Sequence, residues 1–162
     1  RSTLFPYTTL FRSCILLHYL EVLRDKIGFD EIKKKVTNPL KGKKIAAYYG
    51  CLLLRPSKVM QMDDPENPTI MEDFIKALGA TPVKYSMRNE CCGGYTTLEN
   101  KDIARTKAQA VISNAVDNGA EEIITACPLC MYNLKKNSDG SIKITYFTEL
   151  LAQALGLIEE AE

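Results

Sequence analysis

Five cysteines in three groups constrain this chain more than any other feature of its sequence. Cys51 stands alone, Cys91 and Cys92 are adjacent, and Cys127 and Cys130 are separated by two residues. Disulfide frameworks are typical of small secreted domains, whereas clustered cysteines in an intracellular chain more often bind metal or carry out redox chemistry. The pattern therefore favours a metal or redox centre over a disulfide scaffold.

The first thirteen residues, RSTLFPYTTLFRS, resemble the translation of a common sequencing adapter. We expect residues 1–13 to be an artefact with no part in the fold. Cys14 falls at the junction, outside the cysteine pattern, and is interpreted as an ordinary cysteine. The biological sequence is then expected to continue upstream of Cys14.

The remaining chain has the size and composition of one ordinary globular domain, about 150 residues. The net charge is +1 with no basic block, which argues against a nucleic-acid partner. Apolar runs are too short for a membrane span, and no secretory signal is visible. We expect a cytoplasmic protein.

Segments of strand and helix character alternate along the chain. Strands are predicted at 44–50, 81–85, 122–126 and 142–147, and helices at 68–78, 98–118, 131–136 and the C-terminal end. This alternation predicts an α/β fold, a Rossmann-like three-layer arrangement in which helices cover both faces of a parallel sheet.

The cysteines fall at informative places in this scheme. Cys51 follows the first predicted strand, Cys127 follows the third, and Cys91–Cys92 lie in the loop before the long helix. Sites in open α/β sheets gather outside the carboxyl ends of the strands. We therefore expect the three groups to converge at that edge.

An internal repeat bears on domain organisation. Residues 19–29 (YLEVLRDKIGF) align with residues 147–157 (FTELLAQALGL), and each copy reads as an amphipathic helix followed by glycine. Because the second copy ends the domain, residues 14–42 are predicted to be the end of a preceding duplicated half plus a lysine-rich linker, both poorly packed here. Residues 43–162 are predicted to be the cysteine-rich domain.

The strings around the cysteines resemble a known module. GC at Cys51, ECCGG at Cys91–Cys92 and ACPLC at Cys127–Cys130 are similar to the cysteine-rich CCG domain. That module occurs in duplicate in the B subunit of heterodisulfide reductase, and also in iron–sulfur subunits of lactate-utilisation, glycolate-oxidase and succinate dehydrogenase systems. CCGGYTTLENKDIA and ITACPLCMYNL are most similar to the heterodisulfide reductase branch.

The resemblance implies a cofactor, a reaction and partners. All five cysteines, Cys51, Cys91, Cys92, Cys127 and Cys130, would be ligands of a non-cubane [4Fe–4S] cluster, with Cys91, Cys92 and Cys127 closest to the catalytic chemistry. The substrate would be a small-molecule disulfide, in the family that of coenzyme M and coenzyme B. Partners would be the flavin-containing A subunit and the ferredoxin-like C subunit. Holding one of two clusters, the chain alone is expected not to turn over substrate.

The residue types are consistent with such a cluster. Two adjacent cysteines cannot readily direct both sulfurs to one ion but can serve two neighbouring irons, and five thiolates exceed the needs of one tetrahedral zinc. Gly93–Gly94 would allow close backbone approach, and Pro128 would start a helix whose N–H groups point at negative charge.

Three alternatives stay open. The module could relay electrons in a dehydrogenase complex without substrate chemistry. Cys127, Cys130 and the cysteine pair could bind a structural zinc, which would leave Cys51 without a role. Cys127 and Cys130 could instead form a redox disulfide.

Several residues near the cysteines have simpler interpretations. His18 is expected to pack or lie on the surface rather than bind metal. One of Tyr48 and Tyr49 is expected in the core and the other near the metal. Three basic residues in the cysteine loops could attract an anionic substrate, but ordinary exposed surface charge is the preferred interpretation: Arg55, Lys58 and Arg88.

Overall fold

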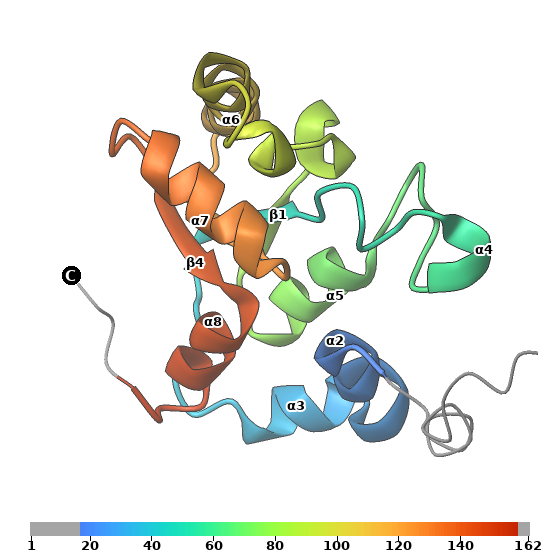
Figure 1. Ribbon diagram of the computed structural model, residues 1–162. Coiled ribbons are helices and arrows are strands. Elements are labelled where there is room, and N and C mark those ends of the chain that lie inside the picture. Colours follow the sequence, from blue (N-terminus) through green and yellow to red (C-terminus); the bar gives the residue numbers. More distant parts are fainter. Residues whose placement is uncertain (1–16, 159–162) are drawn as a thin grey trace, which may run out of the picture.

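Four strands among the described residues form one parallel sheet, with helices on both of its faces (Figure 1). The computed structural model describes residues 17–158; residues 1–13 and Cys14 lie outside that range. The strands are β1 (Lys44–Tyr48), β2 (Thr81–Val83), β3 (Glu122–Thr125) and β4 (Lys143–Tyr146), in the order β2-β1-β3-β4. The predicted α/β fold class is confirmed.

The strand order reverses between β1 and β3: β2 lies on one side of β1, whereas β3 and β4 lie on the other side. Ala46 of β1 has Val83 of β2 on one side and Ile123 of β3 on the other. Such a reversal leaves a crevice outside the carboxyl ends of the two central strands, where ligands bind. Cys51 follows β1 and Cys127 follows β3, so two of the cysteine groups stand at this crevice.

The layers are held by two separate cores. The longer helices are α5 (Ile70–Ala77), α6 (Lys101–Asp117), α7 (Pro128–Asn137) and α8 (Phe147–Ala154). Side chains alternate across a strand, so neighbouring residues of β1 serve opposite faces. Ile45 and Ala47 pack in the core that includes α5 and α8, whereas Ala46 and Tyr48 pack in the core of α6 and α7. Helices on both faces confirm the three-layer prediction.

The segment before the sheet is well packed. It consists of α2 (Tyr19–Glu21), a π-helix η1 (Val22–Ile27) and α3 (Phe29–Lys35). Leu20 and Leu23 are buried, and the ring of Phe29 lies 6.1 Å from that of Phe74 in α5. The expectations of a lysine-rich linker from residue 29 and of a poorly packed first helix are therefore wrong. Phe29, Ile32 and Val36 have helical spacing and pack into the core that includes α5 and α8.

The two copies of the repeat begin alike. His18 precedes α2 and Tyr146 precedes α8, and in each case a glutamate three residues later accepts a hydrogen bond from the backbone N–H of that preceding residue. The distances are 2.7 Å for His18 N to Glu21 Oε2 and 3.2 Å for Tyr146 N to Glu149 Oε2. This is half of the reciprocal capping arrangement that stabilises helix starts. The two segments thus resemble each other in structure as well as in amino-acid sequence.

The copies differ in how they end. Gly156 follows a regular α-helix, whereas Gly28 closes the π-helix through a hydrogen bond from its N–H to the carbonyl of Leu23, 2.9 Å long. Both glycines have positive φ, 70° and 85°, as predicted for glycine just past a helix. The predicted helix of the first copy is therefore present, but most of it is the π-helix η1, in which hydrogen bonds join residues five apart.

Short elements surround the cysteines. They are α4 (Ser57–Met60) after Cys51, the 3₁₀ turn η2 (Ser86–Asn89) before the cysteine pair, and the 3₁₀ turn η3 (Gly94–Thr96) after it. These turns were not predicted, since they carry no periodic apolar pattern. They bring the loops back over the carboxyl edge of the sheet.

Candidate metal centre

Cys51 reaches the centre through a left-handed turn at Gly50. Tyr49 N donates to the carbonyl of Arg88, 2.8 Å away, which joins the end of β1 to the loop of the cysteine pair. Gly50 has φ +65°, and a Cβ at this position would lie 2.9 Å from Cys130 Sγ. Only glycine therefore combines this turn with so close an approach to a cysteine sulfur.

The two glycines that follow the cysteine pair direct their backbone N–H groups at its sulfurs. Gly93 N lies 3.4 Å from Cys91 Sγ, and Gly94 N lies 3.4 Å from Cys92 Sγ, in positions to donate hydrogen bonds to both sulfurs. A Cβ on Gly94 would lie 3.0 Å from the side chain of Leu129 and 3.4 Å from Cys92 Sγ. The backbone at Gly93–Gly94 thus lies close to both cysteine sulfurs, and its approach to the sulfides of a cluster stays a prediction.

Cys127 and Cys130 are placed by the start of α7. Cys127 is the N-cap, Pro128 is the first helical residue, and Cys130 N donates toward Cys127 Sγ at 3.4 Å. A proline suits this position because its missing N–H would have no partner in the first turn. The predicted helix start behind Cys127 is confirmed, and one N–H group of its first turn points at the sulfur of Cys127.

All five predicted cysteines converge at the carboxyl edge of the sheet. Cys92 Sγ and Cys130 Sγ are 3.6 Å apart, and Cys91 is close enough to Cys51 to raise the pKa of its thiol. None of the five forms a disulfide. Within residues 17–158, no three His, Cys, Asp or Glu side chains are disposed to hold a single metal ion. Five thiols exceed the four ligands that a single tetrahedral zinc takes, so this ligand set suits a group with several metal atoms.

The thiols divide negative charge unequally. The pKa values of Cys92 and Cys127 are lowered to about 6, in each case chiefly by hydrogen bonding with Cys130 and further by backbone N–H groups. Hydrogen bonding with Cys127 and Cys92, together with burial, raises the pKa of Cys130. Burial and the proximity of Cys91 raise the pKa of Cys51. Thiolates packed this closely repel one another, so a positively charged metal group would stabilise them.

Asn133, which the sequence analysis did not single out, joins two cysteine groups. Its side chain is completely buried, and its Nδ2 donates to the carbonyl of Cys92 at 2.7 Å. Its Oδ1 accepts hydrogen bonds from Thr97 and Asn137. The Asn133 amide also lowers the pKa of Cys92. The sequence did contain a signal for this role. Asn133 is a polar residue one helical turn after Cys130, and it lies on the same buried face of α7 as Leu134.

The two tyrosines before Cys51 separate as predicted. Both are fully buried, but they face opposite sides of the sheet. Tyr48 lies among the cysteines; burial, and after it the negative charge of the cysteines, raises its pKa, and its hydroxyl donates to Glu90 O at 2.7 Å. Tyr49 lies in the other core and donates to Glu72. Tyr48 thus holds the loop of the cysteine pair against the end of β1 through this hydrogen bond.

The three basic residues do not behave alike. Lys58 is exposed, as expected. Arg55 donates to the carbonyl of Asn89 at 3.0 Å and so ties its loop to the cysteine pair. Arg88 is only 9% exposed, so the expectation of a surface charge is wrong. Its Nε lies 3.5 Å from the carboxylate of Glu72, which compensates for the burial of the guanidinium.

His18 has a packing and capping role. Its ring stacks on Phe147 with 5.8 Å between centroids, and its Nδ1 accepts from Leu20 N at 3.2 Å. Its Nε2 lies 3.4 Å from the carbonyl of Ala126, which also accepts from the Tyr146 hydroxyl. The prediction of packing rather than metal binding is consistent with these contacts.

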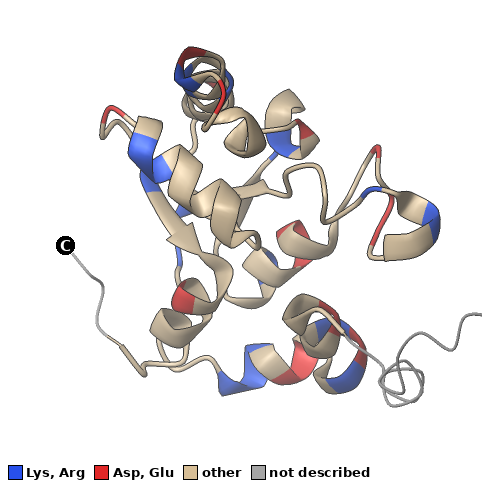
Figure 2. Ribbon diagram, viewed as in Figure 1, with Lys and Arg blue, Asp and Glu red and all other residues tan. Residues whose placement is uncertain are grey.

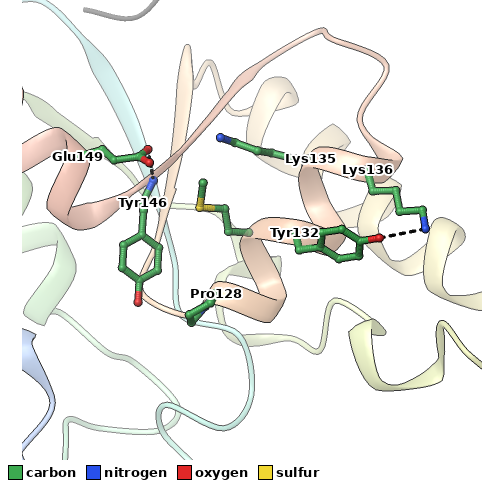
Figure 3. A pocket seen from close by; sticks show the side chains of 7 residues that line it. Pro128, Tyr132, Lys135, Lys136, Tyr146 and Glu149 are labelled. Carbon is green, nitrogen blue, oxygen red and sulfur yellow. Dashed lines mark hydrogen bonds between the residues drawn. The ribbon is translucent and has the colours of Figure 1, made fainter. Parts of the chain in front are cut away.

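Two grooves flank the exposed side of α7. One, of about 600 Å³, is shown in Figure 3, with Tyr132, Lys135 and Lys136 on α7 and Tyr146 and Glu149 opposite. The other, of about 720 Å³, lies between α7 and the segment after the cysteine pair and includes Gly94 and Leu129. Tyr132 and Lys136 line both grooves, so α7 forms the ridge between them.

A family model described as a cysteine-rich domain, CCG, matches residues 45–135, which include all five converging cysteines. The chain is 33% identical over 137 residues to the 8-methylmenaquinol:fumarate reductase membrane anchor subunit of Wolinella succinogenes, covering 79% of this chain and 48% of that protein. It is 32% identical over 155 residues to the B subunit of the ferredoxin:CoB-CoM heterodisulfide reductase of Methanosarcina mazei, covering 86% and 50%. A protein of Archaeoglobus profundus, described as like the B subunit of heterodisulfide reductase, is 28% identical over 159 residues, covering 88% and 52%.

The chain therefore spans about half the length of these curated relatives, all of which are named as reductase subunits or as similar to one. None of the helices in residues 17–158 has the length and apolar character that crossing a bilayer requires.

Proposed function

The chain belongs to the CCG cysteine-rich domain family, and from that premise we propose that it is an iron–sulfur subunit of an oxidoreductase that reduces a small-molecule disulfide. The substrate would be the coenzyme M–coenzyme B heterodisulfide or an analogue. The observation that carries the proposal is the convergence of five free thiols at the point where the sheet reverses. The similarity to a heterodisulfide reductase B subunit over 86% of the chain supports it.

Cys51, Cys91, Cys92, Cys127 and Cys130 would hold the cluster, which we propose to be a non-cubane [4Fe–4S] group. Such a cluster, when bound, supplies single electrons. The chain itself contributes the thiolates, whose charge is already favoured at Cys92 and Cys127, and backbone N–H groups directed at the sulfurs. Buried Tyr48 closes the site from the side of the sheet, which excludes water there.

The wider assembly is part of the same proposal. Because the chain spans half of its relatives and carries one set of ligands, we propose that the whole protein has a second, duplicated set and that this chain alone does not turn over substrate. Partners would be a flavin-containing A subunit and a ferredoxin-like C subunit. Unpaired, clustered thiols suit a reducing compartment, so we propose that the protein is cytoplasmic.

The fumarate reductase anchor relative favours a second candidate. In that alternative the cluster passes electrons between subunits of a dehydrogenase-type complex without acting on a disulfide. The two candidates differ in whether the whole protein consumes a disulfide when supplied with reducing equivalents.

The test is the iron, sulfide and zinc content of the anaerobically purified chain, with its electron paramagnetic resonance spectrum. We expect about four irons and four sulfides per chain. Cys91→Ser and Cys92→Ser should each lose the cluster, whereas Cys14→Ser, outside the pattern, should retain it. About one zinc and no iron after reconstitution would refute the proposal and leave a structural metal domain.

A further inference from the structure

We propose that the groove between α7 and the segment after the cysteine pair is the docking surface for a protein electron donor that has an acidic surface and a one-electron centre. This inference rests on the proposed function, because a centre that reduces a disulfide must receive electrons from elsewhere. It goes beyond that function by assigning the place where they enter.

The groove exposes apolar side chains together. Leu98 is 97% exposed, Tyr95 67% and Tyr132 57%, and all three line the same groove. Soluble domains expose single apolar residues freely, but a gathered patch bounded by polar residues marks an interaction site. Aromatic residues are also enriched at protein interfaces. The surface is thus suited to a protein partner rather than to water.

The floor of the groove lies directly over a cysteine. Gly94 and Leu129 line the groove, and Gly94 N lies 3.4 Å from Cys92 Sγ. The contact is tight, since a Cβ on Gly94 would come within 3.0 Å of Leu129. One layer of backbone therefore separates a docked partner from Cys92. A partner seated here approaches the proposed cluster without crossing the protein core.

The rim of the groove is positively charged. Lys101 and Lys136 line it, and no Asp or Glu does, since the nearby Glu99 and Asp102 do not belong to its lining. Lys136 is held at the rim by a 3.2 Å contact with the Tyr132 hydroxyl (Figure 3). Along α7 itself the only charged side chains are basic (Figure 2). Complementary charge steers association and fixes orientation, so the matching partner surface is acidic.

The proposed step is the transfer of one electron from the reduced donor to the oxidised cluster. Stopped-flow measurement on the anaerobically reconstituted chain would compare two donors. One is a reduced 2[4Fe–4S] ferredoxin, which is acidic; the other is photoreduced 5-deazariboflavin, a small uncharged molecule. For Lys101→Glu/Lys136→Glu we expect the ferredoxin rate at low salt to fall about tenfold or more, with weaker salt dependence. The deazariboflavin rate should not change.

Matched controls separate docking from general charge effects. Lys26→Glu/Lys33→Glu changes the net charge equally, at exposed positions of the N-terminal segment, and should leave the ferredoxin rate within about twofold. Leu98→Ser should slow the ferredoxin reaction, whereas Leu157→Ser, another exposed leucine, should not. Acidic residues suit a first helical turn, so Lys101→Glu is not expected to disturb α6.

The outcomes distinguish the two proposals. A cluster-loaded chain whose ferredoxin rate is unaffected at Lys101, Lys136 and Leu98, or equally affected by the controls, would overturn the docking surface alone. A chain that binds no iron would overturn the proposed function, and the docking surface with it.

Discussion

Replacing Asn133 with leucine tests how the cysteine loop is held to α7. Leucine keeps the volume and removes the amide, so the carbonyl of buried Cys92 loses its 2.7 Å donor. Leaving one buried acceptor without a partner costs about 1–3 kcal/mol. Thr97 and Asn137, the other partners, are only partly buried and can turn to water. The total loss in the free energy of unfolding is therefore expected to stay at about 1–3 kcal/mol.

The assay is urea denaturation of the reduced, metal-free chain under anaerobic conditions. A lower midpoint with an unchanged slope would report lost stability rather than a changed unfolded state. Asn137→Leu is the matched control, because it removes only the 3.0 Å bond to Asn133 Oδ1 and the capping bond to the carbonyl of Asn133 at 2.9 Å, both partly exposed. The control should cost less than Asn133→Leu. Stability within about 0.5 kcal/mol of wild type for Asn133→Leu would refute the reasoning.

The same variant has a second readout in the iron-loaded chain. The amide of Asn133 favours negative charge on Cys92, and polar groups that stabilise negative charge beside an iron–sulfur cluster raise its reduction potential. Asn133→Leu should therefore lower the potential, measured by redox titration with electron paramagnetic resonance detection. A potential equal to that of wild type, together with lost stability, would assign Asn133 a purely structural role.

Gly50→Ala should destabilise the chain by more than about 1 kcal/mol and reduce iron binding, since φ is +65° and the added Cβ meets Cys130 Sγ at 2.9 Å. Gly42→Ala is the control, because Gly42 also has a positive φ, +84°, but an added Cβ there would meet no atom within 4 Å. Equal iron binding by the two variants would contradict the steric argument. Burial raises the pKa of Glu72, so the folded state binds its proton more tightly than the unfolded state. The stabilisation from this protonation is complete below the ordinary carboxyl pKa and is lost as pH rises through the folded value. The unfolding free energy of wild type relative to Glu72→Gln should thus fall from about pH 4 upward, and a pH-independent difference in urea titrations would exclude this role.

The candidate site was largely predictable because its signals are local. Cys51 and Cys127 follow apolar strand segments, and the carboxyl ends of parallel strands share one edge of the sheet. Gly93–Gly94 and Pro128 likewise act within a few residues of the cysteines they serve.

Arg88 and Asn133 were not predictable in this way. A charged residue in a loop is usually exposed, and the burial of Arg88 depends on Glu72, a residue of α5 sixteen positions earlier in the chain. The role of Asn133 depends on the carbonyl of Cys92, forty-one positions away. Hydrogen-bond partners so far apart are fixed by the docking of elements and leave no periodic trace in the sequence.

The amino-acid sequence by itself determined the alternation of strands and helices, the parallel sheet and the edge at which the cysteines gather. These follow from periodicity and chain connectivity, which act over short stretches. The tertiary structure alone decided which sulfurs meet, that residues 29–35 form a packed helix, and that an apolar groove with a basic rim lies over Cys92. Those features depend on side chains from distant segments meeting in one place, and only the packed fold brings them together.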